Sequence, residues 1–118
     1  MTARRAFRLY ARLGLHRMQN WTVADFRRLF GICRTDTLSA MLAVRDTLRA
    51  LQALGDTECI NAVMYVYMSE RGRTPGKSET SRRVLSFALA RYCDERTVYR
   101  KLYKACRMYR NLLQNSEE

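Results

Sequence analysis

The apolar residues between Val98 and Leu112 recur at a spacing that restricts the fold more than any other feature of this chain. At about 100° per residue they share one face of a helix: Val98, Leu102, Ala105, Tyr109 and Leu112. Asp94 stands just before this repeat, where its carboxylate can accept hydrogen bonds from the free amides of a first helical turn. The pattern therefore predicts a long amphipathic helix that begins after Asp94.

The opposite face of this expected helix is basic. It carries Arg96, Arg100, Tyr103, Arg107 and Arg110, with Lys104 at its border. No acidic residue occurs between Glu95 and Glu117. A row of guanidinium groups suits the phosphates and base edges of a nucleic-acid groove. A solvated surface helix can carry the same face, but the absence of acidic residues favours nucleic-acid binding.

A shorter helix and a tight turn precede Asp94, and here the chain resembles a known family. The run Asp94–Leu102, after a helix that ends in Phe87–Cys93, resembles the helix-turn-helix of sigma-factor region 4. It is still more similar to the small ArpU-like, sigma-like transcriptional regulators of Firmicutes phages. Ala88 matches the small residue where the two helices touch, and Cys93 matches the usual hydrophobic residue of the turn. Tyr92 departs from the pattern because Gly is usual there, and Arg91 replaces a usual apolar residue. The resemblance covers about residues 57–113.

The resemblance implies a sequence-specific regulator of phage or mobile-element transcription that binds double-stranded DNA. The expected base-reading residues are Glu95, Arg96, Thr97, Tyr99 and Arg100. The expected phosphate contacts are Arg73, Lys77, Arg82, Arg83, Lys101, Lys104 and Arg107. Because a single helix-turn-helix buries little DNA surface, we expect a homodimer or a contact with RNA polymerase.

The charge distribution agrees with a polyanionic partner. The formal net charge of the 118 residues is +11, and the basic residues gather before residue 35 and after residue 70. Cys33, Cys59, Cys93 and Cys106 form no C-x-x-C pair, and the one histidine is His16. We therefore expect neither a metal site nor a cofactor, and no enzyme, because no nucleophile lies beside a base in a known spacing. No secretory signal or membrane-spanning stretch is visible, so a cytoplasmic protein is expected.

The first half of the chain predicts further helices. Residues 3–18 read as a helix packed on the body, a basic arm that touches DNA, or a membrane-surface helix, with Gly14 as an interruption. Thr22 and Asp25 predict a capping box, and Trp21 can pack on Phe26. Phe26, Leu29, Phe30 and Cys33 then form an expected apolar stripe. Residues 22–42 read either as two packed helices or as a second helix-turn-helix.

The middle of the chain predicts a core helix over residues 37–54, with Gly55 at its end. Its expected apolar face holds Leu38, Met41, Leu42, Leu48, Leu51 and Leu54. Asp56 or Thr57 caps the next segment. Residues 62–68 suit either helix or strand, and helix is favoured because no partner strand is visible.

Residues 69–78 predict a loop whose end imitates a phosphate-binding loop, but the spacing between its glycines is one residue short. Ser78 or Thr80 is expected to cap the following helix, with Arg82 and Arg83 reaching outward to phosphate.

The expected fold is an all-α bundle of five to six helices with a C-terminal helix-turn-helix. Its regions are residues 1–55 for packing, oligomerisation or partner contact and residues 56–118 for DNA binding, or one compact domain. Two other functions are open. One is a DNA replication or packaging accessory protein that uses the same motif. The other is a non-enzymatic interaction protein that binds through its leucine-rich middle.

Overall fold

The structure, a computed structural model, describes residues 1–18, 20–31, 34–69 and 77–116, and within these ranges every regular element is helical. The elements are α1 (Ala3–Arg12), a 3₁₀ turn (Leu15–Arg17), α2 (Val23–Phe30), α3 (Thr35–Ala53), α4 (Thr57–Val66), α5 (Lys77–Ala90) and α6 (Glu95–Ser116). The expected all-α bundle is confirmed. Residues 62–66 belong to α4, so the helical alternative for that segment is confirmed as well.

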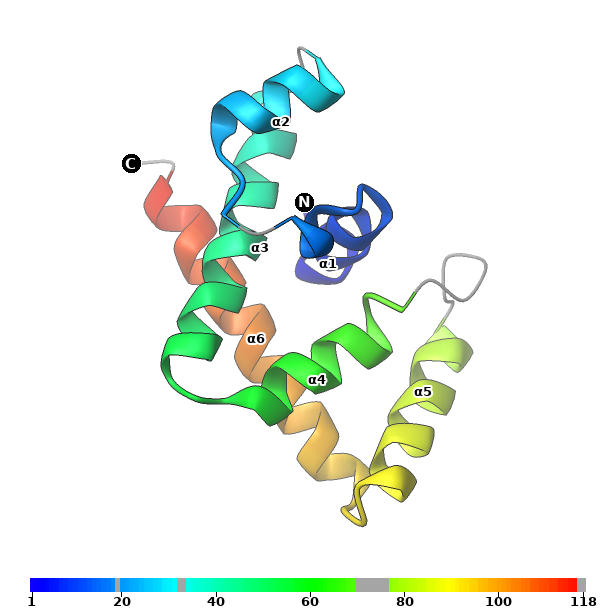
Figure 1. Cartoon of the computed structure of the whole chain (residues 1–118). Helices are drawn as coiled ribbons and strands as arrows, with labels where there is room; N and C mark the ends of the chain where they lie inside the picture. The colour runs from blue at the N-terminus through cyan, green and yellow to red at the C-terminus, as the bar shows by residue number, and fades with distance from the viewer. Residues whose placement is uncertain (19, 32–33, 70–76, 117–118) are drawn as a thin grey trace.

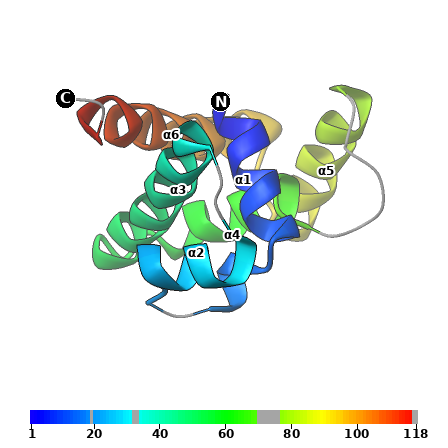
Figure 2. The ribbon, with the colours of Figure 1, turned by 90° about the horizontal axis from the view of Figure 1, so that it is seen from above.

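The long helix α6 is the element against which the other helices pack. It contacts α1, α3, α4 and α5, and Figure 1 shows it running behind α3 and α4. Turned by 90°, Figure 2 shows α1 between α3 and α5. One hydrophobic core includes Phe7 of α1, Met41 of α3, Val63 of α4 and Tyr109 of α6. The regions 1–55 and 56–118 therefore share this core.

Local interactions fix the first two helices. α1 ends at Arg12 rather than continuing to residue 18, because Gly14 adopts a left-handed φ of 75° before the 3₁₀ turn. The capping box of Thr22 and Asp25 is confirmed, and the Trp21 and Phe26 rings lie 5.7 Å apart. The expected apolar stripe along α2 is wrong at Leu29, which is exposed. Cys33 lies outside the described residues.

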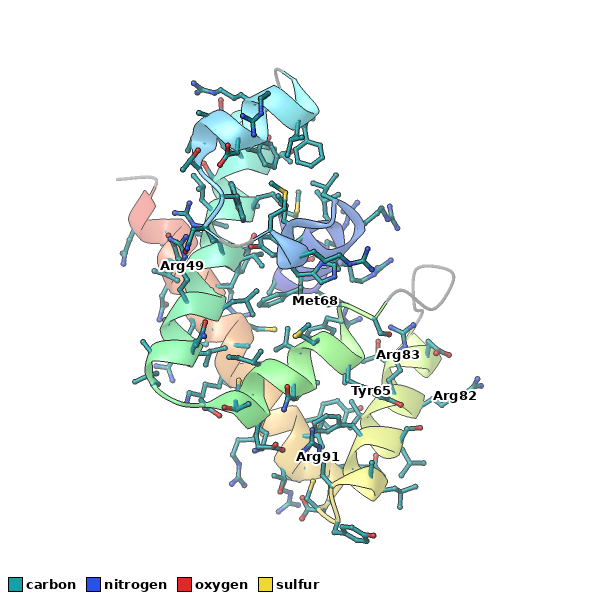
Figure 3. All side chains as sticks on the ribbon, in the orientation of Figure 1. Arg49, Tyr65, Met68, Arg82, Arg83 and Arg91 are labelled. Carbon is teal, nitrogen blue, oxygen red and sulfur yellow. The ribbon has the colours of Figure 1, made fainter. Side chains whose placement is uncertain are left out.

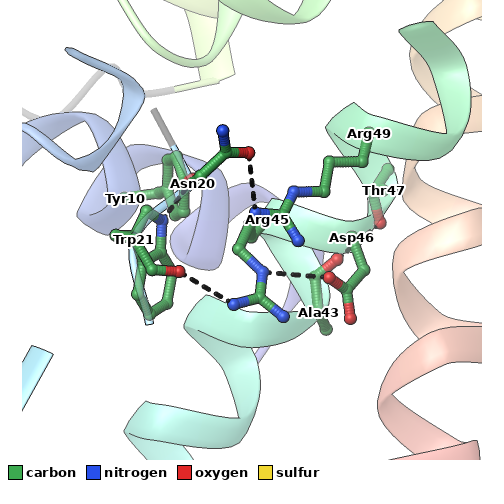
Figure 4. Close-up of polar contacts among 8 residues, drawn as sticks. All are labelled: Tyr10, Asn20, Trp21, Ala43, Arg45, Asp46, Thr47 and Arg49. Atoms are coloured by element: carbon green, nitrogen blue, oxygen red, sulfur yellow. Dashed lines mark hydrogen bonds and ion pairs between the residues drawn. The ribbon is translucent and has the colours of Figure 1, made fainter. Parts of the chain in front are cut away.

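Polar contacts join the segment before α2 to α3 (Figure 4). The Trp21 indole donates to the Tyr10 hydroxyl at 2.9 Å, and the Arg45 guanidinium donates to the Trp21 carbonyl at 3.0 Å. The same guanidinium lies over the Trp21 ring, and Arg49 donates to the Asn20 side chain. These contacts give Arg45 an internal structural role.

The expected core helix is confirmed as α3, but its buried face is displaced from the leucine face. The buried residues are Ala40, Met41, Ala43, Val44, Thr47 and Leu51. Leu54 is exposed, while Leu38, Leu42 and Leu48 are only partly buried. Thr47 is tolerated in the core because its hydroxyl donates to the Ala43 carbonyl at 2.7 Å. Small side chains on this face allow neighbouring helices to approach closely.

Candidate nucleic-acid interface

The first helix of the candidate site begins earlier than the sequence predicts. α5 starts at Lys77, so Ser78 and Thr80 lie inside the helix and the prediction that either caps it is wrong. Thr80 is buried instead. Of the residues expected to contact phosphate, Arg73 lies outside the described residues. Lys77 is placed in the first turn of α5, and its side chain is not described.

The connection between α5 and α6 has the geometry of a helix-ending Schellman motif. The Cys93 amide donates to the Ala88 carbonyl at 3.0 Å, and the Tyr92 amide donates to the Leu89 carbonyl at 3.4 Å. Tyr92 has the left-handed φ of 54° that this motif requires. Its side chain is 98% exposed, so no packing compensates the backbone strain. A tyrosine thus occupies a position that favours glycine.

Asp94 starts α6 as the sequence predicts. One carboxylate oxygen accepts from the Thr97 amide and from the Thr97 hydroxyl, each at 2.8 Å. Hydrogen bonds from the Thr97 hydroxyl and amide lower the pKa of Asp94. The expected apolar face of α6 is confirmed, because Val98, Leu102, Ala105 and Tyr109 are buried and Leu112 is partly buried. The hydroxyl of Thr97, an expected base-reading group, is already used within this cap.

Three contacts hold α4 against α5 and α6. The Lys104 ammonium pairs with the Asp56 carboxylate at 2.5 Å, and this hydrogen bond lowers the pKa of Asp56. The Cys59 thiol donates to the Lys101 carbonyl at 3.1 Å. Arg91 pairs with Glu58 at 3.0 Å. The phosphate contact of Lys104 stays a prediction: its side chain is half-exposed, but its charge already has a partner within the fold.

Asp56 also caps α4, as one of the two expected residues. Its carboxylate accepts from the Cys59 amide at 3.2 Å. The same side chain thus satisfies a free amide of α4 and pairs with Lys104 of α6. Asp56 therefore links the start of α4 to α6.

The outward face of α6 is a row of exposed side chains. It consists of Glu95, Arg96, Tyr99, Arg100, Tyr103, Arg107 and Arg110. No described acidic residue pairs with Arg96, Arg100 or Arg107. The Arg110 guanidinium lies 5.9 Å from the centre of the Tyr103 ring. At 1.5 Å per residue, the guanidinium-bearing positions extend over about 21 Å of helix. Four arginines and two tyrosines therefore project from one rigid element.

Arg82 and Arg83 have opposite surroundings, although they are adjacent in sequence (Figure 3). The Arg82 side chain is 76% exposed and lies 3.6 Å from Glu79, whereas the Arg83 side chain is 7% exposed. Arg83 donates to the Val66 carbonyl at 3.0 Å and to Glu79 at 3.3 Å. The prediction that both residues reach outward is right for Arg82 and wrong for Arg83. The cation of Arg83 is held at the C-terminus of α4, where free carbonyls favour it.

The structure therefore keeps part of the predicted site together. Arg96, Tyr99, Arg100 and Arg107 share one exposed face, and Glu95 lies at its start. Lys101 is partly buried and lies toward the packed side of α6, about 100° around the helix from Arg100. Tyr103 and Arg110 belong to the same face but were not predicted as contact residues. The helical repeat already places both on the basic face of the expected helix.

Other observations restrict the kinds of site that the described part of the chain offers. None of its helices combines the length and the apolar character that crossing a membrane requires. No three His, Cys, Asp or Glu side chains among the described residues are gathered closely enough to hold a metal ion. Comparison with family models, curated proteins and solved structures gave no match to this chain.

Proposed function

We propose that the chain binds double-stranded DNA through a helix-turn-helix formed by α5 and α6. The observation that carries this proposal is the row of guanidinium groups on α6 that lack acidic partners among the described residues. Like charges on one rigid face repel each other in the free protein, and a bound polyanion relieves this repulsion. The buried apolar face of α6 keeps this row in a fixed orientation.

In this proposal the first turns of α6 enter the major groove. Arg96 and Arg100 are one helical turn apart and can each donate two hydrogen bonds to a guanine. Glu95 and Tyr99 complete the base-reading group, whereas Thr97 contributes through its methyl group because its hydroxyl binds Asp94.

Phosphate contacts fix the register of α6 on the duplex. Arg82 at the outer side of α5 and Arg107 further along α6 are exposed and form this group, whereas Lys101 is partly buried toward the packed side of α6. Arg83 and Lys104 are not part of this group, because internal partners hold both. At a log–log slope of about −0.9 for each phosphate contact, Arg82 and Arg107 together contribute about −1.8 to the salt slope of the wild type.

The proposed biological role is transcription regulation of the sigma-like, ArpU-like kind, in a phage or mobile element. A polymerase or a second copy of the chain supplies the additional contact that a small DNA interface needs. Leu85 and Leu89 support such a contact, because they lie one turn apart on α5 and are 44% and 68% exposed. The proposal assigns no catalytic role to any residue.

The same two leucines favour a second candidate function, an interaction protein without DNA binding. The surface first expected for this function, the leucine face of the middle helix, is largely covered in α3. The outward side of α5 takes its place in this alternative. If this alternative holds, a variant that lacks the arginines of α6 should still bind its protein partner.

A titration of labelled duplex DNA tests the proposal against this alternative. The variant Arg96→Ala/Arg100→Ala is compared with the control Arg27→Ala/Arg28→Ala. Arg27 and Arg28 are exposed on α2, and their replacement lowers the net charge by the same amount. We expect the α6 variant to lose at least tenfold in affinity, since each guanine contact contributes about 1–3 kcal/mol. The α2 variant should keep most of the wild-type affinity. Equal affinities for both variants would contradict the assignment of α6.

A further inference from the structure

A second basic site lies away from the outward face of α6, in a cleft between α1 and the start of α3. The two helices are in contact, and Figure 2 shows α1 beside α3. The cleft has a volume of about 490 Å³. Its charged lining consists of Arg5, Arg8 and Arg12 from α1 and Arg34 and Asp36 from the start of α3.

The charge of this cleft is unbalanced. None of the guanidinium groups of Arg5, Arg8 and Arg12 pairs with a described acidic residue. Asp36 is the one carboxylate in the lining, and Arg34 already lies 3.5 Å from it. Four guanidinium groups thus face one carboxylate. Such crowding is unfavourable in the free protein and favourable once an anion enters.

The surroundings of Arg8 show this crowding. Partial burial lowers the pKa of Arg8, and the charges of Arg12, Arg83, Arg4 and Arg5 lower it further. The Thr37 amide in the first turn of α3 donates to Asp36. The start of α3 adds positive potential to the cleft, because the amides of a first helical turn carry partial positive charge.

We infer that this cleft binds phosphate groups of a nucleic-acid backbone, as a second contact beyond the outward face of α6. The inference rests on the proposed function for the source of the phosphate. Arg binds phosphate through a planar fork that Lys lacks. Among the described residues the lining contains no aromatic ring on which a base could stack, so a backbone fits this site better than a free nucleotide.

The C-terminal half of α6 is joined to the start of the chain beside the cleft. The Tyr109 hydroxyl of α6 donates to the carbonyl of Met1, which is part of the cleft lining. Arg4 of α1 and Arg110 of α6 both act electrostatically on Cys106, so their charges lie near the same point.

Alanine substitutions at Arg5 and Arg12 test this inference. Both side chains are exposed and make no ion pair with a described residue, so the double variant should fold with an unchanged Tm. Arg27→Ala/Arg28→Ala is again the matched control. We expect the α1 variant to bind duplex DNA several-fold more weakly. Its salt slope should become less steep by about 1.8, because two phosphate contacts are lost.

Sequence preference separates this inference from the proposed function. If both hold, Arg5→Ala/Arg12→Ala keeps the wild-type preference in a pool of duplexes, and Arg96→Ala/Arg100→Ala loses it. If only the cleft binds nucleic acid, the α1 variant alone loses affinity and no variant changes preference. An affinity and slope of the α1 variant equal to those of the control would overturn the inference. Poly-glutamate serves as a probe for an acidic protein partner. If the α1 variant loses binding to poly-glutamate but binds DNA as the wild type does, the inference would also be overturned, in favour of such a partner.

Discussion

Replacing Arg82 or Arg83 by alanine should have opposite consequences, although the two residues are adjacent and identical. Arg83 is buried and donates to the last carbonyl of α4 and to Glu79. Arg82 is exposed, with only a long ion pair to the same glutamate. We expect Arg83→Ala to destabilise the fold and Arg82→Ala to weaken DNA binding. The pair therefore separates a structural arginine from a contact arginine.

The magnitude follows from the lost contacts. Arg83→Ala removes a charged hydrogen bond, leaves the Val66 carbonyl buried without this donor, and empties the space of a long side chain. Together these changes should cost about 2–4 kcal/mol of unfolding free energy. With an unfolding entropy of about 2.1 cal/mol/K per residue, the 118 residues give a Tm shift of about 4 °C per kcal/mol. Arg83→Ala should thus lower the Tm by about 8–16 °C.

Arg82→Ala should change the Tm by less than about 4 °C, because exposed ion pairs contribute about 0–1 kcal/mol. Its salt slope for duplex DNA should become less steep by about 0.9, the value for one phosphate contact. Thermal unfolding followed by circular dichroism measures the first quantity. Fluorescence anisotropy titrations at several salt concentrations measure the second. Arg83→Lys is an intermediate control, since it keeps the charge but loses the planar fork.

A Tm loss for Arg82→Ala as large as that for Arg83→Ala would refute the assigned orientations. So would wild-type stability of Arg83→Ala with a reduced salt slope, because that result places the Arg83 guanidinium on the surface.

Three further predictions concern the turn between α5 and α6, the Asp94 cap of α6 and the cysteines. Tyr92→Gly should stabilise the fold by about 0.5–1 kcal/mol, measured by urea unfolding, because glycine adopts the left-handed φ of 54° without strain; a loss of stability would contradict the turn geometry. Below about pH 4, the Tm of the wild type should decrease more steeply with falling pH than the Tm of Asp94→Asn. Asp94 has a lowered pKa in the fold, so its contribution is present above its unfolded pKa and is lost as the pH falls through the folded pKa; parallel Tm profiles would argue against this cap. Cys59 should resist alkylation at pH 8 in the native state while Cys93 reacts, because burial raises the pKa of Cys59 to about 11; mass spectrometry of labelled peptides measures this, and equal labelling would contradict the buried position.

Much of the fold could be predicted where the signal is local. The repeat from Val98 to Tyr109 placed both faces of α6, and Asp94 placed its first residue. Thr22 and Asp25 likewise identified the start of α2. These predictions succeed because helical periodicity and capping depend on residues within a few positions of each other.

The errors arose where a distant partner decides the orientation of a side chain. Nothing near Arg83 in the sequence indicates that the carbonyl of Val66 lies within reach of its guanidinium. The pairing of Lys104 with Asp56 spans 48 residues and leaves no local signal. Charge alone predicts phosphate contacts for Lys104 and Arg83, but charge does not distinguish an inward from an outward side chain. The buried face of α3 departs from the expected leucine face because small residues such as Ala40 and Ala43 are buried there, while Leu38, Leu42 and Leu48 are only partly buried.

The cleft between α1 and α3 could not be predicted either. Arg12 and Arg34 belong to different helices, and only the packing of α1 on α3 brings both into one lining. The sequence gives an excess of basic residues before residue 35 without indicating which of them gather.

The central claim is that α6 reads DNA sequence, and selection from a random duplex pool tests it most directly. Wild type and Arg96→Ala/Arg100→Ala are each incubated with the pool at two salt concentrations, and the bound duplexes are sequenced. The account predicts that the wild type enriches a defined site, while the variant keeps weak, salt-sensitive binding without that preference. Enrichment of the same site by both proteins, or of no site by either, would contradict the assignment of α6 as the reading helix.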